Sequence, residues 1–240
     1  MKKRVTLFAF CASVIVLSAF ALVFLRGWWI PNEPSRTDFP IRGLDVSAHQ
    51  GSIDWKQVKA SGMSFVYLKA TEGGDFQDAN FADNLKGARE AGLVCGAYHF
   101  FSLKTPGLTQ AQNFIRTVPR DQVTLPPVID LEFWGNSSAR PTPEAFQSEL
   151  HAYENAIKQA YGQTPLFYTS SDFSDVYLQG YLYARIWARD IFRNPHADGM
   201  GPFNFWQYSD RGRLPGICGF VDLDVFHGSE DDFLKIQQPN

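Results

Sequence analysis

The stretch Pro127-Val128-Ile129-Asp130-Leu131-Glu132-Phe133 has the composition of a buried strand that ends in acidic side chains. It starts at the Pro126-Pro127 pair and ends before Gly135-Asn136, which are turn signals. Because side chains alternate along a strand, Asp130 and Glu132 face the same side, with Cα atoms about 6–7 Å apart. Carboxylates at the end of an apolar strand are costly to bury unless they have a use. A single pattern of this kind is more typical of a salt-bridged strand end, but it is not the only one in the chain.

Seven further runs have the composition of strands, and several also end in polar side chains. With the first stretch, the expected strands are 43–47, 65–71, 93–100, 127–133, 165–170, 184–190, 205–209 and 219–226. Helical patterns cover 54–61, 78–91 and 142–161, and the last begins with Thr142-Pro143-Glu144, a favourable helix start. Strands that alternate with helices predict a parallel sheet, and eight strands predict closure. The expected fold class is α/β, a single TIM-like β/α barrel of eight strands with fewer than eight helices.

Functional side chains of such a barrel gather at the carboxyl ends of its strands. The polar residues expected at those ends are Asp45, Glu72, Tyr98, Asp130, Glu132 and Asp222. The spacing of Asp130 and Glu132 suits general acid and base chemistry on a glycosidic bond.

The motifs resemble those of glycoside hydrolase family 25 lysozymes, the Chalaropsis-type muramidases. The matching segments run in the family's order from about residue 42 to 228: Gly43-Leu-Asp-Val-Ser47 with His49-Gln50-Gly51, Ile53-Asp-Trp55, Tyr67-Leu-Lys-Ala-Thr-Glu-Gly73, Gly96-Ala-Tyr-His-Phe100, Asp130-Leu-Glu132, Phe205-Trp-Gln-Tyr-Ser209 and Val221-Asp-Leu-Asp-Val-Phe226. The resemblance implies a flattened barrel that cleaves the β-1,4 bond between N-acetylmuramic acid and N-acetylglucosamine in peptidoglycan, with no cofactor.

The resemblance and the chemistry of carboxylates together predict roles. Glu132 is the expected general acid, because neighbouring carboxylates raise its pKa. Asp130 is expected to stay ionised and to orient the muramic acetamide group, whose oxygen attacks the anomeric carbon. Asp45 and Asp222, from the first and last strands, complete the expected catalytic set. The expected substrate-binding residues are Tyr98, Glu72, Tyr168, Trp206, Gln207 and Asp224.

The sequence fits two other functions and a metal site less well. A chitinase-like glycosidase usually has a longer D-x-x-D-x-D-x-E series, whereas Pro126, Pro127 and Val128 precede Asp130 here. A catalytically silent peptidoglycan-binding module would lack a carboxylate, yet all four expected ones are present. His49 and His99 could join a metal site, but close-spaced H-x-x-x-H or C-x-x-C pairs do not occur, so no metal is expected.

Residues 5–25 form an uncharged apolar run of 21 residues after Lys2-Lys3-Arg4. This length favours an uncleaved signal anchor over residues 1–26, a transmembrane helix that starts in the cytoplasm. Ala19-Phe20-Ala21 leaves the alternative of signal cleavage and secretion. Residues 27–41 are the expected linker, 42–228 the hydrolase barrel and 229–240 a C-terminal tail.

The charge of the chain bears on its partners. Outside residues 1–26, 18 basic side chains stand against 25 acidic ones, a net charge of −7. This balance argues against nucleic acid as a partner. The expected partners are peptidoglycan glycan strands and, through the N-terminal helix, the cytoplasmic membrane, with a monomeric barrel on its extracytoplasmic side. Cys95 and Cys218 are expected to remain unpaired.

Overall fold

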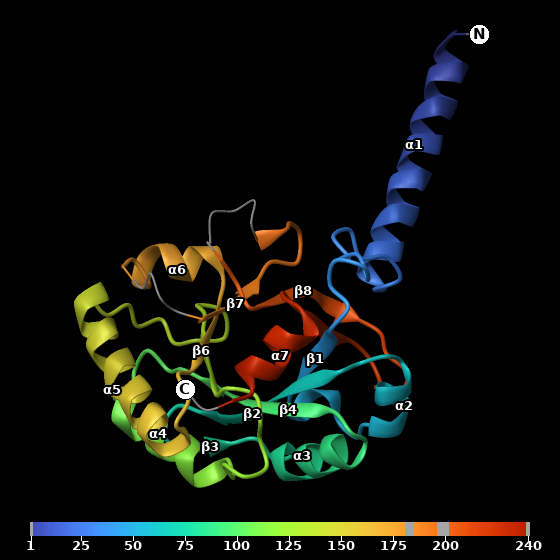
Figure 1. Ribbon diagram of the computed structural model, residues 1–240. Helices are drawn as coiled ribbons and strands as arrows, with labels where there is room; N and C mark the ends of the chain where they lie inside the picture. The colour runs from blue at the N-terminus through green and yellow to red at the C-terminus, as the bar shows by residue number, and fades with distance from the viewer. Residues whose placement is uncertain (1, 181–184, 196–201, 239–240) are drawn as a thin grey trace.

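The computed structural model describes residues 2–180, 185–195 and 202–238, with side chains from Phe10 onward. Its centre is a closed barrel of eight strands (Figure 1). In chain order these are β1 (Arg42–Val46), β2 (Phe65–Glu72), β4 (Val94–Phe100), β5 (Val128–Leu131), β6 (Leu166–Thr169), β7 (Arg185–Arg189), β8 (Phe205–Gly212) and β9 (Val221–Phe226). A short strand, β3 (Phe76–Gln77), pairs with β2 outside the ring. The eight expected strands are confirmed, although Ala184 of the expected sixth lies outside the described residues.

The direction of the last strand differs from the expected parallel sheet. Strands β1, β2 and β4 to β8 pair in parallel, whereas β9 runs antiparallel to both of its neighbours, β8 and β1. A parallel pair needs a crossover of a dozen or more residues, and the connection 213–220 is too short for one. The first residues of β9 therefore lie at the same rim as the last residues of the other seven strands.

Helices cover the outside of the ring. They are α2 (Trp55–Ala60), α3 (Phe81–Glu90), α4 (Gly107–Thr117), α5 (Pro143–Tyr161) and α6 (Ser171–Tyr177). Helix α5 begins as expected, because the Thr142 side chain accepts a hydrogen bond from the Ala145 N–H, and it ends at Gly162 in the left-handed region (φ 69°). Helix α4 was not expected, because two of its buried positions are the amides Gln110 and Asn113 rather than apolar side chains.

The core has an inner layer within the barrel and an outer layer between barrel and helices. The inner layer is aromatic, and glycines make room for it: a Cβ at Gly43 would lie 2.4 Å from the Phe65 ring, and one at Gly96 would lie 2.2 Å from the Tyr67 ring. A last helix, α7 (Glu230–Ile236), closes the barrel at the end opposite the rim. Its Phe233 ring lies 5.7 Å from that of Phe65, so residues 230–236 of the expected tail pack on the barrel core.

The segment 27–41, expected as a linker, also contacts the barrel. Pro34 is buried, and the Phe39 ring lies 5.8 Å from that of Trp206 and 5.6 Å from that of His227. This segment packs on side chains of β8 and of the residue after β9, where no crossover helix separates the two strands.

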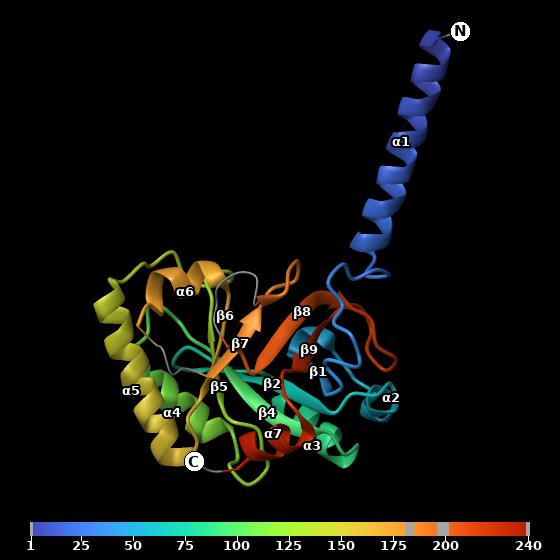
Figure 2. The ribbon, with the colours of Figure 1, turned by 45° about the horizontal axis from the view of Figure 1, so that its top comes forward.

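The first helix, α1 (Lys2–Leu25), extends away from the barrel, as both views show (Figure 1, Figure 2). Within the described part of the chain, no helix has the length and apolar character needed to cross a membrane. The expected transmembrane helix over residues 1–26 is therefore not supported.

Candidate active site

The strand ends bring four carboxylates to one rim of the barrel. Asp45 comes from β1, and Asp130 and Glu132 come from the end of β5. Asp222 is the second residue of β9 and pairs in register with Asp45 of β1. Because β9 runs antiparallel to β1, the start of β9 lies beside the end of β1. The sequence predicts Asp222 at a carboxyl strand end. It lies instead near an amino end, yet at the same rim.

These side chains line a cleft of about 380 Å³. Of the expected site residues, eight line it: Asp45, Glu72, Tyr98, Asp130, Glu132, Tyr168, Gln207 and Asp222. The other lining residues are Val46, Ser47, His49, Gln50, Lys69, Phe100, Trp134, Gly135 and Trp187.

Two expected substrate-binding residues do not line the cleft. Trp206 is 2% exposed, packs in the outer layer and donates a hydrogen bond to the Asp190 carbonyl. Because neighbours on a strand face opposite sides, Gln207 points into the barrel and Trp206 must point outward. Asp224 is fully buried and contacts Asp45 from below the cleft, two residues further into β9 than Asp222.

The pair Asp130 and Glu132 is held in an environment that favours protonation. Burial raises the pKa of Glu132 to about 7, against the opposing charge of Arg189. Burial and the neighbouring charge of Glu132 raise the pKa of Asp130 as well, and Lys69 opposes this rise. The Asp130 Oδ1 atom is buried and has no hydrogen-bond partner among the described residues. A substrate N–H group would satisfy it.

A second set of hydrogen bonds fixes Asp45. The Tyr168 hydroxyl donates to Gln207 Oε1 at 2.9 Å, and Gln207 Nε2 donates to Asp45 Oδ2 at 2.9 Å. Burial raises the pKa of Asp45 to about 6, although its contacts with Gln207 and Asp224 lower it. Gln207 therefore holds the carboxylate of Asp45 in one orientation.

Burial favours the protonated form of Asp224. Trp187 Nε1 donates to its Oδ1 atom at 2.9 Å, while Oδ2 receives no hydrogen bond among the described residues. Full burial raises its pKa far above the usual range. The contact between the two carboxyl groups raises the pKa of Asp224 and lowers that of Asp45, as expected when Asp224 rather than Asp45 holds a proton.

Sequence reasoning missed two cations of the site, Lys69 and Arg189. Lys69 Nζ lies 2.8 Å from Glu72 Oε2 and 5.1 Å from the centre of the Phe100 ring. An irregular step in the pairing of β2 between Lys69 and Thr71 lets residues three apart reach the same cleft. Arg189 ends β7, lies 3.5 Å from Asp210 and opposes the rise in the pKa of Glu132. A lysine inside an otherwise apolar strand was the available signal for Lys69.

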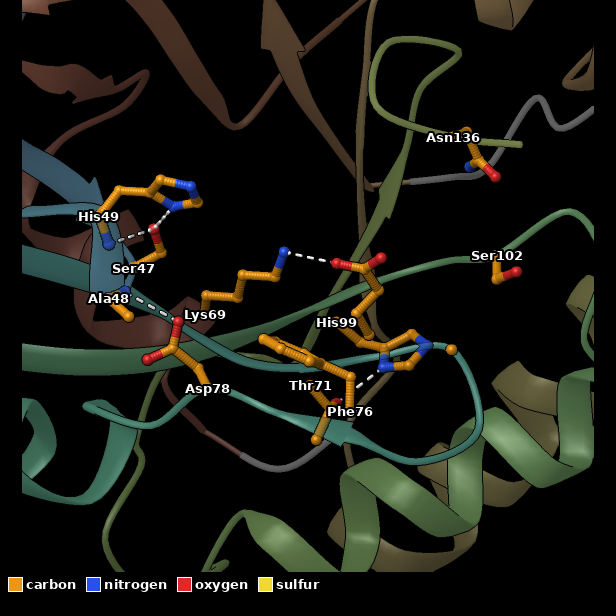
Figure 3. A network of polar contacts seen from close by, with 12 residues as sticks. Ser47, Ala48, His49, Lys69, Thr71, Phe76, Asp78, His99, Ser102 and Asn136 are labelled. Carbon is orange, nitrogen blue, oxygen red and sulfur yellow. Dashed lines mark hydrogen bonds and ion pairs between the residues drawn. The ribbon is translucent and has the colours of Figure 1, made fainter. Parts of the chain in front are cut away.

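The wall formed by residues 47–50 is fixed by short polar contacts (Figure 3). Ser47 Oγ lies 2.8 Å from His49 Nδ1, and the Ala48 N–H donates to Asp78 Oδ2 at 2.8 Å.

Below the cleft, His99 is fully buried, and burial lowers its pKa to about 4. Its ring nitrogens contact Thr71 Oγ1 at 2.7 Å and Gln110 Oε1 at 3.1 Å. Within the described residues no cluster of His, Cys, Asp and Glu could hold a metal ion.

The comparisons with known proteins agree on one family. The model described as "Glycosyl hydrolases family 25" matches residues 44–217. A family 25 glycosyl hydrolase from Bacillus anthracis has a similar structure, with a TM-score of 0.78 and 37% identity, over 83% of this chain and 94% of that one. Lysozyme M1 from Streptomyces globisporus is 33% identical over 82% of this chain and 71% of its own length. The protein YegX from Escherichia coli K12 is 36% identical over 81% and 72%, respectively.

Proposed function

Because the chain belongs to glycosyl hydrolases family 25, we propose that it is a lysozyme, a peptidoglycan hydrolase that cleaves the β-1,4 bond between N-acetylmuramic acid and N-acetylglucosamine. Two properties of neighbouring carboxyl groups support this chemistry: the raised pKa of Glu132 and the unpartnered oxygen of Asp130. Glu132 has a pKa of about 7, so it holds a proton near neutral pH. Beside it, Asp130 presents a buried oxygen that has no partner among the described residues.

Glu132 acts as the general acid. It transfers its proton to the glycosidic oxygen as the bond to the anomeric carbon breaks, which makes the N-acetylglucosamine hydroxyl the leaving group. The resulting carboxylate then removes a proton from the water molecule that attacks the anomeric carbon. One residue thus supplies a proton in the first step and recovers one in the second.

Asp130 acts on the acetamide group of the muramic sugar. The acetamide oxygen attacks the anomeric carbon and forms a cyclic intermediate, so positive charge develops on the amide nitrogen. The amide N–H donates to the unpartnered Asp130 Oδ1 atom, and this contact favours the ionised form of Asp130. The positive charge of Lys69 favours the same form.

The other rim residues position substrate and water. Asp45 and Asp222 accept hydrogen bonds from sugar hydroxyls or water above β1 and β9. Burial, with the charges of Asp45 and Asp130, raises the pKa of Tyr98 well above its usual range, so its hydroxyl stays protonated and can donate near the acetamide. Glu72, Tyr168 and Gln207 complete the cleft, and Asp224 acts from below through Asp45.

The enzyme acts as a monomeric barrel on the extracytoplasmic side, where peptidoglycan is found. N-terminal sequencing of the exported protein distinguishes a retained N-terminus from cleavage after Ala21, which would leave Leu22 as the first residue.

The test is mass spectrometry of the products released from purified peptidoglycan, with Glu132→Gln as the inactive control. The expected products carry N-acetylmuramic acid at the new reducing end. Products that end in N-acetylglucosamine or in a 1,6-anhydro ring would contradict the proposed bond. Cleavage of chitin oligomers without cleavage of peptidoglycan would identify a chitinase, and binding without any product would identify a silent module.

A further inference from the structure

Trp134 lines the cleft with a ring that is almost fully exposed. Its side chain is 84% exposed, whereas the other tryptophan of the cleft, Trp187, is 1% exposed and lies in the barrel core. Among the described residues, no aromatic contact involves Trp134. The ring therefore adds nothing to the core, and its apolar faces stay in water until a ligand covers them.

The backbone that carries Trp134 is nevertheless fixed. Residues 133–136 form a turn in which the Asn136 N–H donates to the Phe133 carbonyl at 3.2 Å. Gly135, the residue after Trp134, adopts a positive φ of 75°, a conformation that favours glycine. Trp134 thus occupies the corner of a defined turn.

The Asn136 side chain anchors this turn to the neighbouring loop (labelled in Figure 3). Its Nδ2 atom donates to the Phe101 carbonyl at 2.7 Å and to the Glu132 carbonyl at 3.2 Å. Its Oδ1 atom accepts from the Leu103 N–H at 3.1 Å. One half-buried amide therefore ties the backbone of Glu132 and the turn that bears Trp134 to residues 101–103.

Phe133 anchors the turn on its other side. Its ring lies 4.8 Å from that of Phe173 and 5.8 Å from that of Tyr177, and the Arg140 guanidinium lies 4.5 Å above it. Phe133 and Asn136 are both held, so the backbone that carries Trp134 has a defined position two residues after Glu132. Such preorganisation lowers the entropic cost of binding.

We infer that Trp134 is a stacking platform for a sugar ring on the leaving-group side of the scissile bond. β-1,4-linked pyranoses carry their substituents around the ring edge and expose C–H faces, and an aromatic ring covers such a face well. The side follows from the order along the chain. Asp130 lies under the acetamide of the sugar that is attacked, and Glu132 lies beside the leaving oxygen. Trp134 follows Glu132 by two residues, in the turn that Asn136 ties to the Glu132 carbonyl.

This inference rests on the proposed function, and it makes Trp134 a determinant of substrate length rather than of bond chemistry. Binding energy from the platform is available before the bond breaks, so it lowers KM more than it raises kcat. Glycan strands that extend beyond the cleavage point are therefore the preferred substrates.

The experiment compares Trp134→Ala with the wild-type chain on two glycan substrates that carry no stem peptides. One is the tetrasaccharide of two N-acetylglucosamine–N-acetylmuramic acid units, and the other is the β-methyl glycoside of one such disaccharide, which has no sugar on the leaving-group side. We expect KM for the tetrasaccharide to rise about 3- to 10-fold, with kcat changed less than KM, and Trp134→Phe to restore the wild-type KM. The kinetic constants for the methyl glycoside should not change.

The control is Trp28→Ala, because Trp28 is also exposed (65%) but lies outside the cleft. An unchanged KM for the tetrasaccharide would overturn the inference, and an equal loss on both substrates would place the platform on the other side of the bond. Either result leaves wild-type cleavage intact, whereas failure of the proposed function would show as absence of wild-type cleavage.

Discussion

Asp45 and Asp222 stand opposite each other on β1 and β9, although these two strands run in opposite directions. Burial raises the pKa of Asp222 well above its usual range, and the charge of Asp45 adds to this rise. Two ionised carboxylates cannot be buried this closely without a large cost. The rim therefore keeps protons near neutral pH, and this is the environment in which Glu132 acts as an acid.

Glu132→Gln should remove nearly all activity on purified peptidoglycan, because an amide cannot protonate the leaving oxygen. General acid catalysis alone contributes about 10²–10⁴-fold. In the wild-type enzyme, kcat/KM should fall as pH rises through about 7, where Glu132 loses its proton. A rate above a tenth of the wild-type rate for Glu132→Gln would mean that another group is the acid.

Asp130→Asn should also lower kcat strongly, because an amide stabilises the positive charge on the acetamide nitrogen far less than a carboxylate does. Binding of sugar should be retained, since an amide oxygen still accepts a hydrogen bond where Asp130 Oδ1 has no partner in the free enzyme. Calorimetric titration with a slowly cleaved glycan oligomer measures this affinity. A large loss of affinity with little loss of kcat would assign Asp130 to binding instead.

Glu132→Gln should stabilise the fold at alkaline pH. The pKa of Glu132 is raised from 4.5 to about 7 on folding, so the folded state keeps a proton that the unfolded chain loses within this window. The free energy of unfolding therefore falls as pH rises from 4.5 to 7, and the variant escapes this loss. Urea unfolding should show it to be about 1–3 kcal/mol more stable than wild type at pH 8, with no difference at pH 4.

The matched control for this stability gain is Glu90→Gln, at the exposed end of α3. Its effect on the free energy of unfolding should be small at both pH values. Equal stability of Glu132→Gln and wild type at pH 8 would show that the buried, ionised side chain of Glu132 does not destabilise the folded state.

Asp224→Asn and Asp224→Leu should behave differently, although both remove the carboxyl group. The Asn amide can donate to Asp45 and accept from Trp187 Nε1, as the protonated acid does, so activity should stay close to wild type. Leu can do neither. It leaves the Trp187 N–H unpaired, which should lower the free energy of unfolding by about 1–3 kcal/mol.

The same pair of variants has a kinetic signature. Loss of the Asp224 donor should raise the pKa of Asp45 above its value of about 6, so the acidic limb of the pH–rate profile should move to higher pH in Asp224→Leu alone. If Asp224→Asn were as damaging as Asp224→Leu, Asp224 would have to be ionised in the native enzyme.

The sequence could predict what depends on near neighbours in the chain. Alternation along β5 places Asp130 and Glu132 on one face, and this was confirmed by their common place in the cleft. The signals of Thr142-Pro143 and Gly162 bound α5 as expected. Each of these features is decided within about one turn or one strand, where local backbone preferences and hydrogen-bonding side chains act.

Tertiary structure alone decided the rest of the site. The antiparallel direction of β9 comes from closing the ring with a connection too short for a helix, and it puts Asp222 at the rim through its amino end. The irregular pairing in β2 brings Lys69 and Glu72 together against simple alternation. Trp206 faces outward because Gln207 faces Asp45. These features depend on pairing between strands far apart in the sequence, and neither composition nor periodicity contains that information.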